Sequence, residues 1–161
     1  MIEQALVSVE DWALVVALRN STFLYPLVNA GHILGVSILV GGIVPLDLRL
    51  LGLWRHYPVM VFVDVLRITS AMGLGLAVVS GALLFATAAV DYAGSPLFQV
   101  KMVLVLLGVL NALILGRVLK RQSIQSLPMN APMPSSVRAG AALSLVVWIS
   151  VLILGRLLGY F

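Results

Sequence analysis

Four apolar runs, each long enough to cross a membrane, dominate the pattern of hydrophobic and polar positions in this chain. The first extends from Ser21 to Gly52 and carries no charged residue before Asp47. At a rise of about 1.5 Å per residue, such a run spans the roughly 30 Å hydrocarbon core of a bilayer. The pattern predicts an all-α, integral membrane, four-helix up-down bundle, with spanning helices over about 22–46, 65–90, 97–115 and 137–158.

The first twenty residues have a different pattern. Glu10 and Asp11 would lie in mid-membrane if this segment spanned the bilayer, which costs several kcal/mol. Ser8 is a residue type that caps helices, and Trp12 is typical of the membrane interface. We therefore expect an N-terminal interfacial helix over about 9–19, lying on the membrane surface; the alternative is a frayed tail.

Small and polar residues recur at helical spacing on the first two spanning helices. They are Asn29, His32, Gly35, Leu39 and Gly42 on the first helix, and Ser70, Gly73, Ala77, Ser80 and Gly81 on the second. Residues three and four apart share one face of a helix, and small residues let two helices approach closely in a membrane. We expect both faces to contact protein rather than lipid.

Composition supports this interpretation. Of 161 residues, 61% are hydrophobic and 10% are charged, with a mean hydropathy of +1.13, whereas soluble domains are roughly a quarter charged. Residues 1–161 are therefore expected to form a single integral membrane domain in a lipid bilayer. The chain has no cysteine, which excludes disulfides and thiolate metal sites. The net charge of +4 does not indicate a nucleic-acid partner, because the basic residues cluster in the loops between the apolar runs.

The distribution of basic residues predicts the orientation in the membrane. The connections after the first and third spanning helices contain Arg49, Arg55, Arg117, Lys120, Arg121 and Arg138. Basic loops remain in the cytoplasm by the positive-inside rule. We expect a multi-pass protein of the bacterial inner (plasma) membrane with both termini outside the cytoplasm.

Only one histidine, His32, lies within an apolar run. Counting about ten residues down each helix from the outer surface places Ser80, Gly81, Gly108 and Trp148 at a similar depth. Glycines beside an imidazole leave space for a ligand. Cationic side chains lie nearer the outer surface. The candidate cofactor-binding residues are His32, Gly35, Ser80, Gly81, Lys101, Trp148 and Arg156, with His32 as the metal ligand.

This arrangement suggests haem b or a metal, bound through His32 for electron transfer. Imidazole is a good iron ligand, and Lys or Arg can pair with haem propionates. A second axial ligand is harder to find, since His56 lies in the cytoplasmic loop and Met102 lies near the outer surface by this counting. A five-coordinate haem remains, as does one shared by the His32 residues of two protomers across the Gly31-xxx-Gly35 face.

A structural role for His32 is the alternative. A membrane histidine also serves by hydrogen bonding across helices, here to Asn29, Ser80, Asn111 or a backbone carbonyl. The protein would then be a structural or accessory subunit that packs in a homo-oligomer or against a larger membrane complex. Lys101 would in that case extend its charge to the outer headgroups.

Other chemistry has less support in the sequence. Met129 and Met133 form a thioether pair that suits cuprous ion, although two methionines in a proline-rich loop are more often incidental. The apolar runs contain no nucleophile beside a base and no paired carboxylates. An enzyme is therefore disfavoured.

Two short patterns carry a family resemblance. His32-x-x-Gly35 is followed by Asp47-x-Arg49-x-x-Gly52, and the third apolar run begins with Phe98-x-x-Lys101-Met102 and continues to Asn111. Over about 20–116 the chain resembles a group of small bacterial four-helix membrane proteins known only as a domain of unknown function. It is distantly similar to CopD-like and b-type cytochrome membrane proteins, in which helix histidines hold haem or metal. The unknown-function family itself implies no activity.

Overall fold

The computed structural model describes residues 2–121 and 131–160, which form helices and no strands. In chain order the helices are α1 (Ile2–Glu10), α2 (Ala13–Asn20), α3 (Leu24–Leu51), α4 (Val59–Ala86), α5 (Ala89–Gly94), α6 (Pro96–Arg121) and α7 (Ser135–Leu157). Helices α3, α4, α6 and α7 are long and apolar enough to cross a membrane. The predicted all-α membrane bundle is therefore confirmed.

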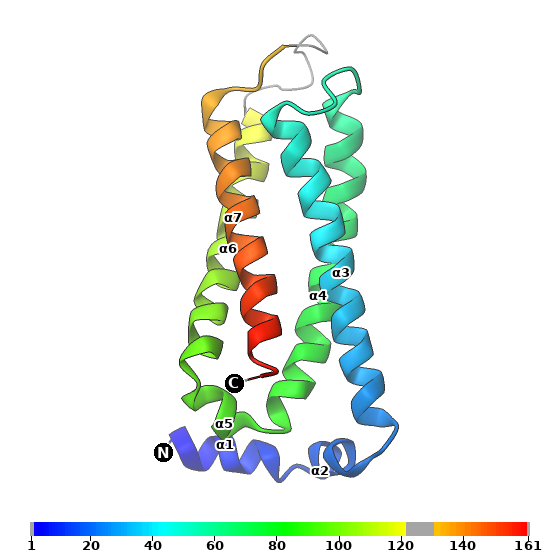
Figure 1. The fold of residues 1–161 in the computed structure, drawn as a ribbon, viewed down its shortest axis with the longest axis vertical. Helices are drawn as coiled ribbons and strands as arrows, with labels where there is room; N and C mark the ends of the chain where they lie inside the picture. The colour runs from blue at the N-terminus through cyan, green and yellow to red at the C-terminus, as the bar shows by residue number, and fades with distance from the viewer. Residues whose placement is uncertain (1, 122–130, 161) are drawn as a thin grey trace.

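The four long helices run side by side along one axis (Figure 1). Helices α1 and α2 lie across the lower end of this bundle, where both ends of the chain are also found. The α3–α4 connection, the last turns of α6 and the start of α7 lie at the opposite end. This is the up-down order predicted from the sequence, with the basic connections at one end and the termini at the other.

Helices α3 and α4 form the tightest pair in the bundle. A Cβ atom placed on Gly35 would lie 2.6 Å from the backbone nitrogen of Ala77, so no larger residue fits this crossing. The predicted stripe on α4 is buried at Ser70, Gly73, Ala77 and Ser80. Helix α6 packs along α7, and the two pairs join mainly through α3 and α7. The side between α4 and α6 is therefore the more open one.

The spanning helices α3 and α4 extend further than the sequence pattern predicted. Helix α3 continues through Pro45 to Leu51, because one missing backbone donor does not outweigh the packing beyond it. Gly52 ends the helix with a φ of 116°, a left-handed conformation that glycine adopts without strain. Helix α4 begins directly after Pro58 and so includes Asp64, which the prediction had assigned to the preceding loop.

The N-terminal segment differs from the single helix expected over 9–19. It is divided at Asp11 and Trp12 into α1 and α2. Glu10 ends α1, and its Oε1 accepts a hydrogen bond of 2.9 Å from the backbone N–H of Val90 in α5. This long-range bond fixes Glu10 at the junction of α1 and α5. Ser21 caps α3, because its hydroxyl oxygen accepts a 3.0 Å bond from the N–H of Leu24.

Candidate functional site

His32 is held in one orientation by helix α4. Its Nδ1 lies 2.9 Å from the carbonyl oxygen of Ala77, and the Ser80 hydroxyl lies 3.4 Å from the same nitrogen. A carbonyl oxygen only accepts, so Nδ1 carries the hydrogen and the neutral ring keeps a free lone pair on Nε2. The ring lies against Gly81, where a Cβ atom would come within 2.9 Å of His32 Cε1. Metal-bound histidines commonly use this arrangement, donating from one nitrogen and ligating with the other.

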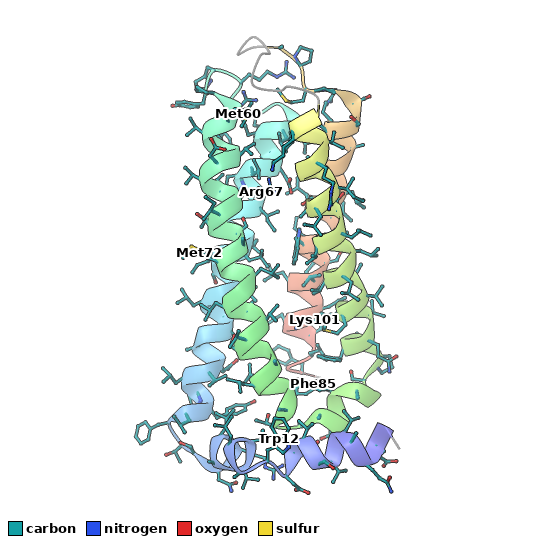
Figure 2. The ribbon with its side chains drawn as sticks, turned by 180° about the vertical axis from the view of Figure 1, so that it is seen from behind. Trp12, Met60, Arg67, Met72, Phe85 and Lys101 are labelled. Atoms are coloured by element: carbon teal, nitrogen blue, oxygen red, sulfur yellow. The ribbon has the colours of Figure 1, made fainter. Side chains whose placement is uncertain are left out.

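His32 lines a cavity of about 380 Å³, which we call the His32 cavity; it is enclosed by residues of α3, α4, α6 and α7. Ligand pockets typically measure about 300–1,000 Å³. Val78 on α4 and Met102 on α6 both line it and are 55% and 41% exposed. The cavity therefore opens sideways between α4 and α6, on the side that Figure 2 views with Lys101 and Phe85 labelled. In a membrane this opening faces lipid.

Lys101 brings a positive charge to the same cavity. Its Cε and Nζ atoms lie 3.6 Å from the point where a Cβ atom on Gly155 would be, so this glycine lets the lysine lie close to α7. Its ammonium is within electrostatic range of the His32 ring. No acidic side chain pairs with Lys101 among residues 2–121 and 131–160. An acidic group of a ligand would supply that partner.

Two other predicted residues meet at this depth. Trp148 is 2% exposed and lines the His32 cavity. Its indole lies over Gly108, where a Cβ atom would come within 2.8 Å of Cζ2. The two glycines expected at the level of His32 thus make room for rings. Gly81 accommodates the imidazole of His32, and Gly108 accommodates the indole of Trp148.

Three predicted site residues do not line the His32 cavity. Gly35 lies in the α3–α4 crossing. The Ser80 hydroxyl donates to the carbonyl of Leu76 and contacts His32 at Nδ1. Arg156 is exposed, donates to the Tyr160 hydroxyl and lies over the Tyr160 ring at 4.8 Å from its centroid. Gly35 and Ser80 therefore contribute to the packing of α3 on α4, and Arg156 contributes to the C-terminal turn.

Residue counting predicted that Met102 lies too near the outer surface to serve as a ligand, yet it lines the same cavity as His32. His32 is eight residues from the start of α3 at residue 24, and Met102 is six from the start of α6 at residue 96. The difference of two residues is only about 3 Å in depth. The thioether of Met102 therefore lies at the cavity of His32, although residue counting had excluded Met102 as a second axial ligand.

The Gly31-xxx-Gly35 face is only partly free for a second protomer. The space beside Gly35 is filled by the backbone of Ala77 in the same chain, whereas a methyl group added at Gly31 would meet no described atom within 4 Å. Of the two glycines on this face, only Gly31 is therefore open to a second protomer, and a haem shared by two His32 residues stays a prediction.

The remaining residues of the two sequence patterns have structural contacts. Arg49 is 1% exposed, and its Nε and Nη2 donate to the Tyr57 carbonyl at 3.1 and 2.8 Å, which holds the α3–α4 connection. Asn111 joins α6 to α7 by donating a 3.0 Å bond to the Gly140 carbonyl. Phe98 stacks on Phe85 with 5.2 Å between the ring centroids, and both rings line the His32 cavity.

Tyr92 in α5 forms an aromatic group with Phe85 and Phe98. The centroid of its ring lies 5.6 Å from that of Phe98. Burial, together with nearby Tyr25 and Asp91, raises the pKa of the Tyr92 phenol. The phenol is therefore neutral at physiological pH. It adds an apolar surface below the cavity and no charge.

The described residues contain no group of three or more His, Cys, Asp or Glu side chains that could hold a metal ion. Met133 is buried in a hydrophobic cluster with Leu50 and Val137, and Met129 lies outside the described residues. The thioether pair suggested for cuprous ion is therefore untested.

Comparison with known proteins gives one match. No curated protein and no solved structure matches the chain. The family match covers residues 20–161, further than the 20–116 over which the resemblance was drawn, and it gives no support to a similarity with CopD-like or cytochrome proteins. On this match the chain belongs to a family of unknown function, DUF6644.

Proposed function

We propose that this protein binds a membrane-soluble ligand in the His32 cavity, one that is apolar over most of its surface and carries an acidic group. The observation that supports this is the pairing of two unsatisfied groups in one apolar cavity. His32 keeps a free Nε2 because its Nδ1 is engaged by Ala77, and Lys101 has no acidic partner in the described structure. The lateral opening between α4 and α6 would admit such a ligand from the bilayer.

Haem b is the ligand that these side chains suit best, and electron transfer is the activity that it would support. His32 Nε2 would ligate the iron, Lys101 would pair with a propionate, and Met102 lines the same cavity as a candidate second ligand. Gly81 leaves room beside the imidazole. Haem supplies one-electron chemistry when bound; the chain's own residues would hold it and exclude water from it.

The alternative is an accessory subunit that packs against other membrane helices, in a bacterial inner membrane. Gly31, Gly41 and Gly75 favour it, because a methyl group added at any of them would meet no described atom within 4 Å. Small residues on an outward helix face suit close packing of another helix. In this case the bond from His32 to Ala77 only joins α3 to α4.

An absorption spectrum and a solvent extract of the protein, purified in mild detergent from cells with ample haem, test the proposal. We expect a Soret band at stoichiometric intensity, lost in His32→Ala. Gly81→Ala should also lose it, because the new methyl displaces the imidazole, whereas Gly75→Ala on the same helix should not. A colourless protein whose extract contains another acidic lipid in stoichiometric amount would show that the His32 cavity binds a ligand of the proposed class. That ligand would then not be haem. An empty extract overturns the proposal and favours the accessory subunit.

A further inference from the structure

Asp47 is a buried carboxylate with one oxygen unsatisfied. It lies on α3, a turn before the helix ends, and is 2% exposed. Ser144 on α7 provides a side-chain hydrogen bond, but Oδ2 has no hydrogen-bond partner in the described structure. A buried acceptor without a partner has lost its hydration and gained no hydrogen bond in return. Arg49 does not neutralise it, since its guanidinium donates to the carbonyls of Tyr57 and Arg55.

A second buried, unsatisfied group belongs to a residue that lines the same cavity as Asp47. Asp47 and Trp148 both line a cavity of about 250 Å³, which we call the Asp47 cavity. The indole Nε1 of Trp148 is buried and also lacks a partner in the described structure. Trp148 is four residues from Ser144, so both side chains lie on the same face of α7, one turn apart. An unsatisfied acceptor and an unsatisfied donor therefore line one cavity.

Water is the ligand whose chemistry suits both groups. A water molecule can donate to the Asp47 carboxylate and accept from the Trp148 N–H, whereas a cation would satisfy only the carboxylate. A water molecule needs about 10–15 Å³ of cavity volume open to its centre, and two to four polar partners. The Asp47 cavity has room for several, and the Ser144 hydroxyl supplies a third polar group.

Arg67 lies at the mouth of the Asp47 cavity. It comes from α4, lines the cavity and is exposed between α4 and α6, where Figure 2 labels it. Its Nη2 lies 2.8 Å from the point where a Cβ atom on Gly116 of α6 would be, so the guanidinium bridges the gap between the two helices. Of the residues that line this cavity on α3, α4, α6 and α7, Asp47 and Arg67 are the charged ones.

We propose that the Asp47 cavity is a hydrated proton-binding site, reached from the basic end of the bundle past Arg67. A proton arriving on water at the mouth is transferred to Asp47 Oδ2, which converts the carboxylate to the acid and leaves neutral water; release follows the same route. Leu39, Leu74 and Trp148 line both cavities and so separate this site from His32. The proposal is independent of any ligand in the His32 cavity.

Trp148 fluorescence provides a local test. In a Trp12→Phe, Trp54→Phe background, Trp148 is the remaining tryptophan of the three in the chain. Its emission should change with pH in a single transition, because protonation of Asp47 removes a charge beside the indole. Asp47→Asn should abolish the transition, and Asp64→Asn, at an exposed position of α4, should leave it. Emission that is independent of pH, or that titrates equally in Asp47→Asn, overturns the proposal.

Two measurements without a variant at Asp47 keep the test decisive if Asp47→Asn fails to fold. Infrared spectra of the protein with ¹³C-labelled aspartate should show a protonated carboxyl band that disappears with rising pH. The indole N–H of Trp148 should exchange within seconds in D₂O, as a hydrated group does. A buried aspartate that shows no such band at any pH, or an indole that exchanges only on unfolding, contradicts a hydrated proton site.

Discussion

The Nδ1 atom of His32 on α3 lies 2.9 Å from the carbonyl oxygen of Ala77 on α4. The backbone nitrogen of Ala77 is also the atom that limits the residue at position 35, since a Cβ atom on Gly35 would lie 2.6 Å from it. The same turn of α4 therefore sets both the distance between the two helices and the direction of the imidazole. Any change that separates α3 from α4 should also move His32 Nε2.

Gly35→Ala tests this coupling. The added methyl collides with backbone atoms that cannot move independently, and overpacking of this kind costs about 1–3 kcal/mol. Gly31→Ala, one turn earlier on α3, meets open space and should be neutral or stabilising by up to about 1 kcal/mol, the usual gain in helix propensity. Thermal unfolding in detergent measures both. Equal midpoints for the two variants would show that the crossing is not tight at Gly35.

His32 variants separate a packing role from a ligand role. His32→Gln should lower the free energy of unfolding by about 0.6 kcal/mol, the average for a hydrogen bond between membrane helices. It should nevertheless remove the ligand, since an amide does not replace imidazole on iron. His56→Ala serves as the control, because His56 lies in the α3–α4 connection at the far end of the bundle. Retention of the ligand by His32→Gln would contradict ligation through Nε2.

Helical periodicity was sufficient to predict the bundle and its closest contacts. The stripes on α3 and α4 follow from spacing three and four apart, and the equal-depth count correctly placed Gly81 with His32 and Gly108 with Trp148. The same count failed for Met102, because it depended on where each helix starts. Asn29 was also assigned to the buried face, but it is exposed at the outer end of α3.

The sequence pattern did not predict which charged residues are buried. Asp47 was assigned to a loop because charges normally mark the end of a span, whereas it lies within α3 and is buried. Which partner a buried charge finds depends on the packing of four helices, as with Ser144 beside Asp47. Spacing along one helix holds no information about that partner.

Arg49→Lys should destabilise the α3–α4 connection. The guanidinium donates to the Tyr57 carbonyl through two nitrogens and to the Arg55 carbonyl at 3.4 Å, a geometry that an ammonium cannot reproduce. Hydrogen bonds to a charged group contribute about 1.5–3 kcal/mol, and we expect a loss in that range. Arg117→Lys, at an exposed position of α6, should change the unfolding free energy little. Similar stabilities of the two variants would remove the structural role assigned to Arg49.

Glu10→Ala should release the N-terminal helices from the end of the bundle where α5 lies. Its carboxylate accepts the bond from Val90 N–H, and this contact joins α1 to α5. Hydrogen exchange at the Val90 amide should accelerate, while exchange in the middle of α4 should not. Glu3→Ala, exposed on α1, provides the matched control. An unchanged exchange rate at Val90 would mean that this bond does not hold α1 in place.

Reporter fusions test the orientation that the basic residues predict. The α3–α4 connection, the last turns of α6 and the start of α7 lie at one end of the bundle, and both termini lie at the other. Arg55 in the first connection and Arg117 and Lys120 near the end of α6 place an excess of positive charge at the connection end, and basic loops stay in the cytoplasm. Tags before Met1 and after Phe161 should therefore report the outside, and a reporter inserted between α6 and α7 the cytoplasm. If both terminal tags report the cytoplasm, the bundle is inverted; proton access to Asp47 would then be from the outer face.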